Sequence, residues 1–353
     1  MHDPECLNWM ELLAGSVTTA QALPPELRSM EDDIAAVSRV YPMRINPYYL
    51  RLIKERGGAL WRLVIPDKAE LTDTLPSDDP LNETVQSPVP GIIHRYPDRV
   101  IFLVSGICPV LCRFCMRKRL AGKAASLTER QIADAVAYIQ ADTNVREVIF
   151  SGGDPLMLTD DILAAVLDKV HCIPHVEILR IHTKAPVGLP QRVTPALAGL
   201  LQRFHPLYIN IHVNHPDELS RPAGAACALL ADAGIPLGSQ TVLLKGVNDS
   251  SEVMIRLMRQ LLRYRVKPYY LHHPDLVRGT GHFRMPVTRG LAIMREMVGH
   301  ISGSAVPRYM IDLPGGGGKV PLLPEYVRQL TRIQMTVENY CGDIYQYPVP
   351  DRS

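Results

Sequence analysis

The 353-residue chain lacks any apolar run of roughly 18 residues, so no membrane-spanning helix is expected. Aromatic residues are scarce, at 6%, and the formal net charge is only +2. A net charge so close to zero favours no particular class of partner, and the chain has no long basic run of the kind that binds nucleic acid. The N-terminus also lacks the basic and then apolar pattern of a secretion signal. We therefore expect a soluble cytoplasmic protein with neither a membrane nor a nucleic-acid partner.

A disulfide framework is also missing. The chain has seven cysteines, an odd number, and three of them lie in the stretch "CPVLCRFCMRKR", Cys108–Arg119. Such clustering favours a reducing compartment over a secreted, disulfide-linked protein. Cys108, Cys112 and Cys115 have the spacing C-x3-C-x2-C, and no other cysteine supplies the fourth ligand that structural zinc requires. The three closely spaced cysteines predict a 4Fe–4S centre in which one iron has no cysteine ligand and is open to another ligand. A non-catalytic iron–sulfur or zinc-binding module remains the alternative of another class.

Strand-like apolar runs alternate with helical stretches over the middle of the chain. The six runs are Val100–Ser105, Val145–Phe150, Val176–Thr183, Leu207–Val213, Pro236–Leu244 and Pro268–His272. Such alternation predicts a parallel sheet with helical crossovers. A doubly wound sheet and a barrel both fit, and six units suit an incomplete TIM-like (β/α)6 barrel. We expect three parts: a helical or irregular region at 1–90, the barrel at 91–300 and a C-terminal segment at 301–353.

Two further motifs stand out. Ser151, Gly152, Gly153 and Asp154 end the second predicted strand, where glycines would let the backbone approach a ligand and Asp154 could pair with an ammonium. Lys319 follows four glycines in "LPGGGGKV", which fails the phosphate-loop pattern. A lysine there could be a solvated residue on a flexible turn, or it could bind pyridoxal 5′-phosphate (PLP) covalently.

The cysteine spacing after the first strand, together with "SGGDP" after the second, resembles the radical S-adenosylmethionine (SAM) superfamily. This resemblance implies that Cys108, Cys112 and Cys115 hold the cluster and that its open iron chelates SAM. An electron delivered to the cluster then cleaves SAM to a 5′-deoxyadenosyl radical. Ser151–Asp154 would contact SAM, and His212 would line the same side of the site.

The motifs "SPVPGIIHRYPDRV", "VNHP", "AGIPLGSQTVLLKGVND", "HFRMPVTRG" and "PGGGGK" are similar to those of the lysine 2,3-aminomutase family, over roughly residues 40 to 325. This resemblance implies a PLP-dependent isomerase that moves the α-amino group of L-lysine to the β-carbon. The residue roles it implies are Lys319 for covalent PLP binding, Arg95, Arg99 and Gln240 for the PLP phosphate, Arg117 for the substrate carboxylate, and Asp275 and Asp312 for the side-chain ammonium.

Some positions depart from the family's pattern. Ser250 stands where clostridial-type members have a zinc-binding cysteine, and the C-terminal cysteine cluster is missing, so zinc is not expected and the oligomer contacts stay open. His272 and His273 precede Asp275, and because neighbouring strand residues point to opposite faces, at most one should face the site. A radical SAM aminomutase that acts on another amino acid, or an enzyme of the branch that serves β-lysylation of an elongation factor, remains an alternative. An electron donor such as flavodoxin or ferredoxin and association into a homo-oligomer are further expectations.

Overall fold

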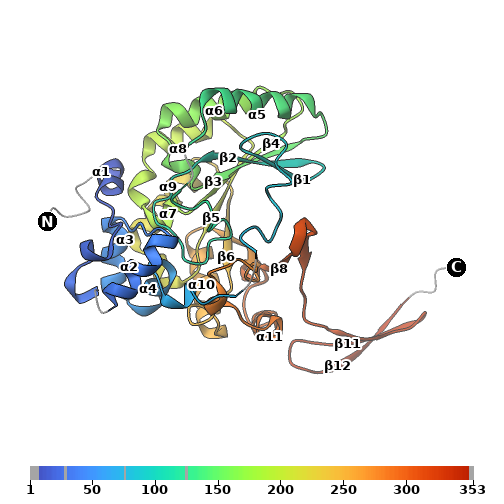
Figure 1. Cartoon of the computed structure of the whole chain (residues 1–353). Coiled ribbons are helices and arrows are strands. Elements are labelled where there is room, and N and C mark those ends of the chain that lie inside the picture. The colour runs from blue at the N-terminus through green and yellow to red at the C-terminus, as the bar shows by residue number, and fades with distance from the viewer. Residues whose placement is uncertain (1–7, 28–29, 75–76, 124–125, 350–353) are drawn as a thin grey trace.

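The structure is a computed structural model that describes residues 8–27, 30–74, 77–123 and 126–349. Its centre is a curved nine-stranded sheet whose spatial order follows the chain from β1 to β9 (Figure 1). The strands are β1 (Ile92–Tyr96), β2 (Arg99–Ser105), β3 (Glu147–Gly152), β4 (Ile178–Thr183), β5 (Leu207–His212), β6 (Leu237–Val242), β7 (Lys267–His272), β8 (Arg308–Leu313) and β9 (Gly318–Pro321). Strands β2 to β8 are parallel, and β1 and β9 are antiparallel edges.

Helices connect the parallel strands and cover the outside of the sheet (Figure 1). They are α5 (Glu129–Ala141), α6 (Asp160–His171), α7 (Ala185–Gly188), α8 (Pro195–Gln202), α9 (Arg221–Asp232), α10 (Ser251–Arg263) and α11 (Val287–Met297). The main hydrophobic core lies between these helices and the outward faces of the strands. Because the strand order never reverses, the sheet is an open barrel rather than a doubly wound fold, and no pairing among the described residues joins β1 to β9.

The predicted fold class is confirmed. The six predicted strands are β2 to β7, and each begins and ends within two residues of its predicted bounds. The prediction missed β8, which continues the parallel sheet, and the two antiparallel edges. Strand β8 has the sequence RYMIDL, in which polar residues break the apolar pattern because its inner face carries part of the site. The sheet therefore runs past residue 300, and the three-part division of the chain stays a prediction.

Helices α2 (Glu31–Val40), α3 (Pro47–Arg56) and α4 (Gly58–Val64) form a second core beside the barrel, whereas α1 (Trp9–Ala14) packs on the main core through Leu12. This N-terminal region holds the cysteine-bearing loop through hydrogen bonds. Asn46, at the N-cap of α3, donates from Nδ2 to the carbonyl oxygens of Pro109 at 2.9 Å and Gly188 at 2.8 Å. The backbone N–H of Arg113 donates to Leu63 at 2.9 Å. The region therefore positions the cluster motif rather than serving as a separate appendage.

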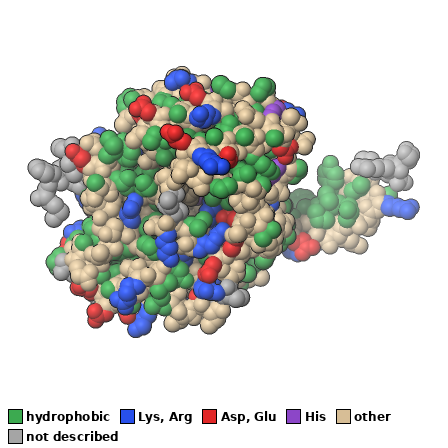
Figure 2. Space-filling view, turned by 45° about the horizontal axis from the view of Figure 1, so that its top comes forward, with side chains coloured by type: hydrophobic (Ala, Val, Ile, Leu, Met, Phe, Trp, Pro, Cys, Tyr) green, Lys and Arg blue, Asp and Glu red, His purple; other side chains and the backbone are tan. Residues whose placement is uncertain are grey.

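A separate three-stranded antiparallel sheet, β10 (Val327–Leu330), β11 (Gln334–Glu338) and β12 (Ile344–Pro348), stands off from the body (Figures 1 and 2). It carries exposed apolar side chains, which include Leu330 and Tyr347. None of the helices in the described ranges combines the length and the apolar character that a membrane span requires.

Candidate active site

The cysteine loop follows β2 at the carboxyl edge of the parallel strands, which is where such folds place their chemistry. A buried charged group holds the loop from the N-terminal side. Arg113 donates to both carboxylate oxygens of Glu70, at 2.9 and 2.6 Å, and Lys118 approaches the same carboxylate at 2.7 Å. We call Glu70, Arg113 and Lys118 the loop clamp. All three residues are at most 3% exposed, so the loop is fixed by a dry and fully paired group.

The three cysteines of the loop suit an iron–sulfur cluster. Cys108, Cys112 and Cys115 are free thiols with partly exposed side chains. Desolvation raises the pKa of each thiol above its ordinary value, and that of Cys112 to about 12. Bound iron would offset the cost of these buried thiolates. No group of three His, Cys, Asp or Glu side chains in the described ranges converges on a single metal ion. A 4Fe–4S cluster differs from a single ion because each cysteine binds a separate iron.

The glycine turn after β3 packs directly on the start of the cysteine loop. Gly153 and Asp154 donate their backbone N–H groups to the carbonyl oxygens of Ser105 at 2.6 Å and Ile107 at 2.7 Å. A Cβ atom on Gly152 would lie 2.4 Å from the Ser105 oxygen, and one on Gly153 would lie 2.5 Å from the Ile107 oxygen. Both positions therefore require glycine, because any side chain would push the turn away from the cysteine loop.

The Asp154 carboxylate points toward the end of β4. It accepts from Thr183 Oγ1 at 2.7 Å, from the Lys184 N–H at 2.7 Å and from the Leu156 N–H at 3.0 Å. In this arrangement the side chain fixes the glycine turn and has little capacity left for a ligand. The predicted pairing of Asp154 with an ammonium therefore stays a prediction.

His212 ends β5 and faces a polar barrel interior. Its ring lies edge-on to that of His182, with the centroids 5.9 Å apart, and Asn210 Nδ2 lies 3.1 Å from His182 Nε2. Desolvation and then the nearby cations Lys184 and Arg117 lower the pKa of His212 to about 4. This histidine is therefore a neutral group at physiological pH, able to donate or accept but not to supply positive charge.

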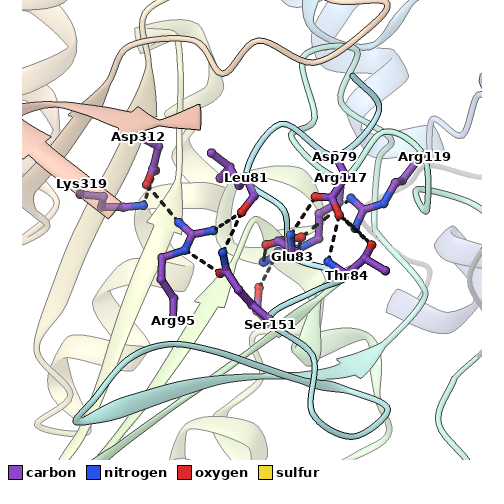
Figure 3. Close-up of polar contacts among 11 residues, drawn as sticks. Asp79, Leu81, Glu83, Thr84, Arg95, Arg117, Arg119, Ser151, Asp312 and Lys319 are labelled. Atoms are coloured by element: carbon purple, nitrogen blue, oxygen red, sulfur yellow. Dashed lines mark hydrogen bonds and ion pairs between the residues drawn. The ribbon is translucent and has the colours of Figure 1, made fainter. Parts of the chain in front are cut away.

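Lys319 lies at the opposite side of the barrel opening, in the hairpin of β8 and β9 (Figure 3). Asp312 and Lys319 are cross-strand partners, and the Lys319 ammonium forms an ion pair with the Asp312 carboxylate. Arg95 Nη1 approaches the other oxygen of Asp312 at 3.3 Å. We call Arg95, Asp312 and Lys319 the pocket group. Its side chains are 5–27% exposed, which makes it wetter than the loop clamp.

The glycines before Lys319 form a tight turn rather than a loose tether. Gly315, Gly316 and Gly318 have positive φ angles of 71°, 87° and 87°, which side chains rarely adopt. A Cβ atom on Gly316 would lie 1.8 Å from Gln86 Nε2. These glycines therefore let the hairpin turn closely against residues 81–86.

The other two predicted phosphate ligands differ in their surroundings. Gln240 is a buried residue of β6, in register with His212 and Tyr270 on the neighbouring strands. Arg99 begins β2, is one-third exposed, stacks over the ring of Tyr96 at 4.0 Å and donates to Asp98 at 2.6 Å. Arg95 and Lys319 are therefore brought together, whereas Arg99 makes only local contacts.

Asp275 follows β7, and the charges of the pocket group shift its pKa. Desolvation and then the charge of Asp312 raise the pKa of Asp275 to about 7, and Lys319 opposes this shift. The two predicted ammonium ligands thus lie close enough to repel each other. Burial and then the charges of Lys319 and His212 lower the pKa of His272, whereas His273 bonds to the Tyr309 hydroxyl at 2.8 Å. As predicted, only one of the two adjacent histidines faces the site.

Arg117 lies between the cysteine loop and the pocket group. Its guanidinium forms two hydrogen bonds with Glu83, from Nε at 2.9 Å and from Nη2 at 2.7 Å, and Nη1 reaches Ser151 Oγ at 3.5 Å (Figure 3). Sequence reasoning missed Glu83 and Glu70. It also missed the buried pair of Lys184 and Glu218, which lies beside Cys112. Only the fold brings these residues to the site, since no local motif marks them.

Comparisons with known proteins agree with this geometry. A family model described as "Radical SAM superfamily" matches residues 102–258, and one described as "Lysine-2,3-aminomutase" matches residues 294–353. The chain is 41% identical to L-lysine 2,3-aminomutase of Clostridium subterminale, over 99% of the chain and 85% of that protein. It is 40% identical to the Bacillus subtilis protein of the same name, over 98% and 74%.

A relative with a different substrate in its name is nearly as similar. Glutamate 2,3-aminomutase of Clostridioides difficile is 41% identical, over 83% of this chain and 70% of that protein. Overall identity therefore does not separate the two substrates, and the residues of the pocket must do so.

Proposed function

Because the chain belongs to the radical SAM lysine 2,3-aminomutase family, whose members are isomerases that use a 4Fe–4S cluster, SAM and PLP, we propose that it converts L-lysine to β-lysine. The observation that supports lysine as the substrate is that two carboxylates lie near Lys319: Asp312 forms an ion pair with the Lys319 ammonium, and the charges of both Asp312 and Lys319 act on Asp275. The coarser statement, a radical SAM aminomutase, follows from the family itself.

We assign the cluster to Cys108, Cys112 and Cys115. The support is one rigid loop of three free thiols at the carboxyl edge of the sheet. We assign the SAM contacts to Ser151, Gly152, Gly153 and Asp154, in the turn packed on this loop, and to His212 at the end of β5. Bound together, cluster and SAM supply the radical that removes hydrogen from the substrate. The part of this chain is to hold the cysteine loop in place, through the loop clamp and the glycine turn, at the carboxyl edge of the sheet.

We assign PLP to Lys319, with Arg95, Arg99 and Gln240 for its phosphate. The polar barrel interior and the tight hairpin support this assignment. Arginine forks suit phosphate oxygens, and Arg95 is already held at the hairpin by Asp312 and Gln86. Bound PLP supplies an electron sink for the migrating amino group. If Lys319 held PLP, the ammonium that now pairs with Asp312 would be taken up by the cofactor, and Asp312 would be available to another cation.

The selection of lysine then follows from charge. At an effective dielectric near 20, two charges about 4 Å apart interact by roughly 4 kcal/mol. Burial and then repulsion from Asp312 raise the pKa of Asp275 to about 7, and a lysine side-chain ammonium would offset both by pairing with the two carboxylates. A glutamate side chain would add a third negative charge and be rejected. At the other end of the substrate, Arg117 is the assigned partner of the α-carboxylate.

The experiment that tests this function is anaerobic incubation of the reconstituted enzyme with SAM, PLP, a reductant and a panel of amino acids. We expect β-lysine from L-lysine and no product from glutamate. Turnover of another amino acid, or modification of an elongation factor with no reaction of free lysine, would replace the proposed substrate. Iron and sulfide counts on the same preparation test the cluster independently.

The proposal also includes partners and location. The cluster needs a one-electron donor, for which flavodoxin or ferredoxin is suited. The exposed apolar side chains of β10–β12 support association of this chain with copies of itself. Ser250, at the expected zinc position, instead caps α10 by accepting from the Val253 N–H at 3.3 Å, so zinc is not part of the proposal. A reducing, cytoplasmic location remains a prediction from the cysteine pattern.

A further inference from the structure

Glu83 is a buried carboxylate that the proposed function leaves unexplained. It is 3% exposed and belongs to the segment that precedes β1. Its two oxygens accept from Nε and Nη2 of Arg117, at 2.9 and 2.7 Å, along one edge of the guanidinium (Figure 3). Such a bidentate contact fixes the plane and rotation of the guanidinium as well as its position.

The contact leaves part of Arg117 unused. A guanidinium has five N–H donors, and Glu83 takes one from Nε and one from Nη2. Nη1 makes only a long contact of 3.5 Å to Ser151 Oγ. The end of the fork, made of Nη1 and the second N–H of Nη2, therefore has capacity for another carboxylate. Because Arg117 and Glu83 together carry no net charge, a substrate carboxylate meets oriented donors rather than a mobile side chain.

Glu83 is itself held by a well-bonded turn. The Asp79 carboxylate accepts from the N–H of Glu83 at 3.0 Å, from the N–H of Thr84 at 2.9 Å and from Thr84 Oγ1 at 2.7 Å. Arg119 approaches Asp79 at 3.1 Å. These bonds fix the backbone of Glu83, so its carboxylate approaches Arg117 from a defined position.

The same segment reaches the pocket group. The Leu81 carbonyl accepts from Arg95 Nη2 at 3.1 Å, and Gln86 Oε1 accepts from Arg95 Nε at 2.8 Å. The Pro80 carbonyl accepts from the Gly315 N–H at 2.8 Å. Residues 79–86 thus set the distance between the assigned carboxylate fork on Arg117 and the hairpin that carries Lys319 (Figure 3).

We propose that Glu83 is a positioning residue for the aminomutase reaction: it orients Arg117 so that the free end of the guanidinium binds the α-carboxylate of the amino acid. This inference rests on the proposed function of Arg117. Glu83 itself touches neither substrate nor cofactor, and its effect passes through Arg117.

The test measures steady-state kinetics with L-lysine, together with PLP content, iron content and thermal midpoint. Glu83→Gln keeps the shape of the side chain but removes the charge, so the KM for lysine should rise roughly tenfold, with a smaller change in kcat. The thermal midpoint and both cofactor loadings should stay near those of the wild type. Glu147→Gln is the control, because Glu147 also pairs with a partly buried arginine, Arg180, but at the amino ends of the strands, away from the site. It should leave the KM unchanged.

A double-mutant cycle separates positioning from general stability. Glu83→Gln should have little further effect on the KM in an Arg117→Gln background, because there is no guanidinium left to orient. Equal effects of Glu83→Gln in both backgrounds would overturn the proposal, and so would a lower KM in the single variant, which would mean that Glu83 competes with substrate. If Glu83→Gln does not fold, Glu83→Asp, which keeps the charge but shortens the reach, should show the raised KM.

Failure of the proposed function gives a different result. A wild-type KM for lysine in Arg117→Gln alone would remove the carboxylate assignment from Arg117, whatever Glu83 does. If the wild-type enzyme did not turn over lysine, lysine would be refuted as the substrate.

Discussion

The loop clamp and the pocket group have the same composition: one carboxylate between an arginine and a lysine. In the loop clamp, Glu70 receives a two-bond fork from Arg113 as well as the Lys118 ammonium, and all three side chains are nearly inaccessible. In the pocket group, Asp312 receives a single 3.3 Å bond from Arg95 as well as Lys319, whose side chain is 27% exposed.

The two groups differ in how many of their N–H donors already have a hydrogen-bond partner within the protein. Arg113 also donates to the carbonyl oxygens of Pro42 at 2.7 Å and Tyr41 at 3.2 Å, and Lys118 to that of Arg113 at 2.6 Å, so the loop clamp is closed to ligands. The pocket group keeps one face open to the barrel. We therefore infer that the same charges serve as a fixed support in the loop clamp, whereas in the pocket group they can exchange partners with a ligand. Burial and hydrogen-bond saturation, rather than residue type, separate the two.

The largest expected effect comes from removing the lysine of the pocket group. Lys319→Ala should lose covalently bound PLP and fall to background activity, because the variant lacks the amine to which we assign the cofactor. Borohydride reduction of the wild type followed by peptide mapping should place PLP on Lys319, with the cluster intact in both proteins. A label on another lysine would remove Lys319 from the assignment.

The next effect tests the loop clamp. Glu70→Gln leaves Arg113 and Lys118 buried without their counter-charge, which should cost about 3 kcal/mol or more of stability and reduce iron loading. Burial and Arg113 already lower the pKa of Lys118 to about 8, so the variant should release a proton there. Asp312→Asn is the comparison, and in the wetter pocket group it should change the unfolding free energy by about 1 kcal/mol or less. Equal losses of stability in both variants would erase the distinction between the two groups.

A smaller effect is expected on substrate binding. Asp275→Asn and Asp312→Asn should each raise the KM for lysine and lower kcat/KM by about tenfold, with PLP and iron content unchanged, because each removes half of the ammonium site. Kinetics with L-lysine measure this directly. Unchanged lysine turnover in both variants would mean that the substrate ammonium binds elsewhere.

The smallest effect is a pH dependence. The pKa of Asp275 is raised to about 7, so the carboxylate is protonated below that pH and ionised above it. Lysine binding needs the ionised form, and kcat/KM for lysine should therefore fall as the pH drops through about 7. The matching stability effect has the opposite sign, since ionising Asp275 in the empty site costs stability as the pH rises from about 4 to 7. Asp275→Asn should lose this step in the kcat/KM profile, and a profile identical to that of the wild type would assign the step to another group.

The sequence predicted those parts of the molecule that local patterns encode. Strands β2 to β7 follow from apolar runs, and the cysteine loop and the glycine-flanked Lys319 follow from contiguous motifs. Arg113 and Arg117 illustrate what local patterns could not predict. They lie four residues apart in one basic loop, yet the first is locked in the loop clamp and the second faces the site. Their partners, Glu70 and Glu83, lie 43 and 34 residues away in a segment without a regular pattern. Only the fold could reveal those pairings.

The most direct test of the account is a competition in one anaerobic reaction that contains equal amounts of isotopically labelled L-lysine and L-glutamate with SAM, PLP and a reductant. The account predicts labelled β-lysine as the only rearranged product, because Asp275 and Asp312 accept an ammonium and repel a carboxylate. Labelled β-glutamate, or no rearrangement of lysine by enzyme with full cluster and PLP content, would contradict it.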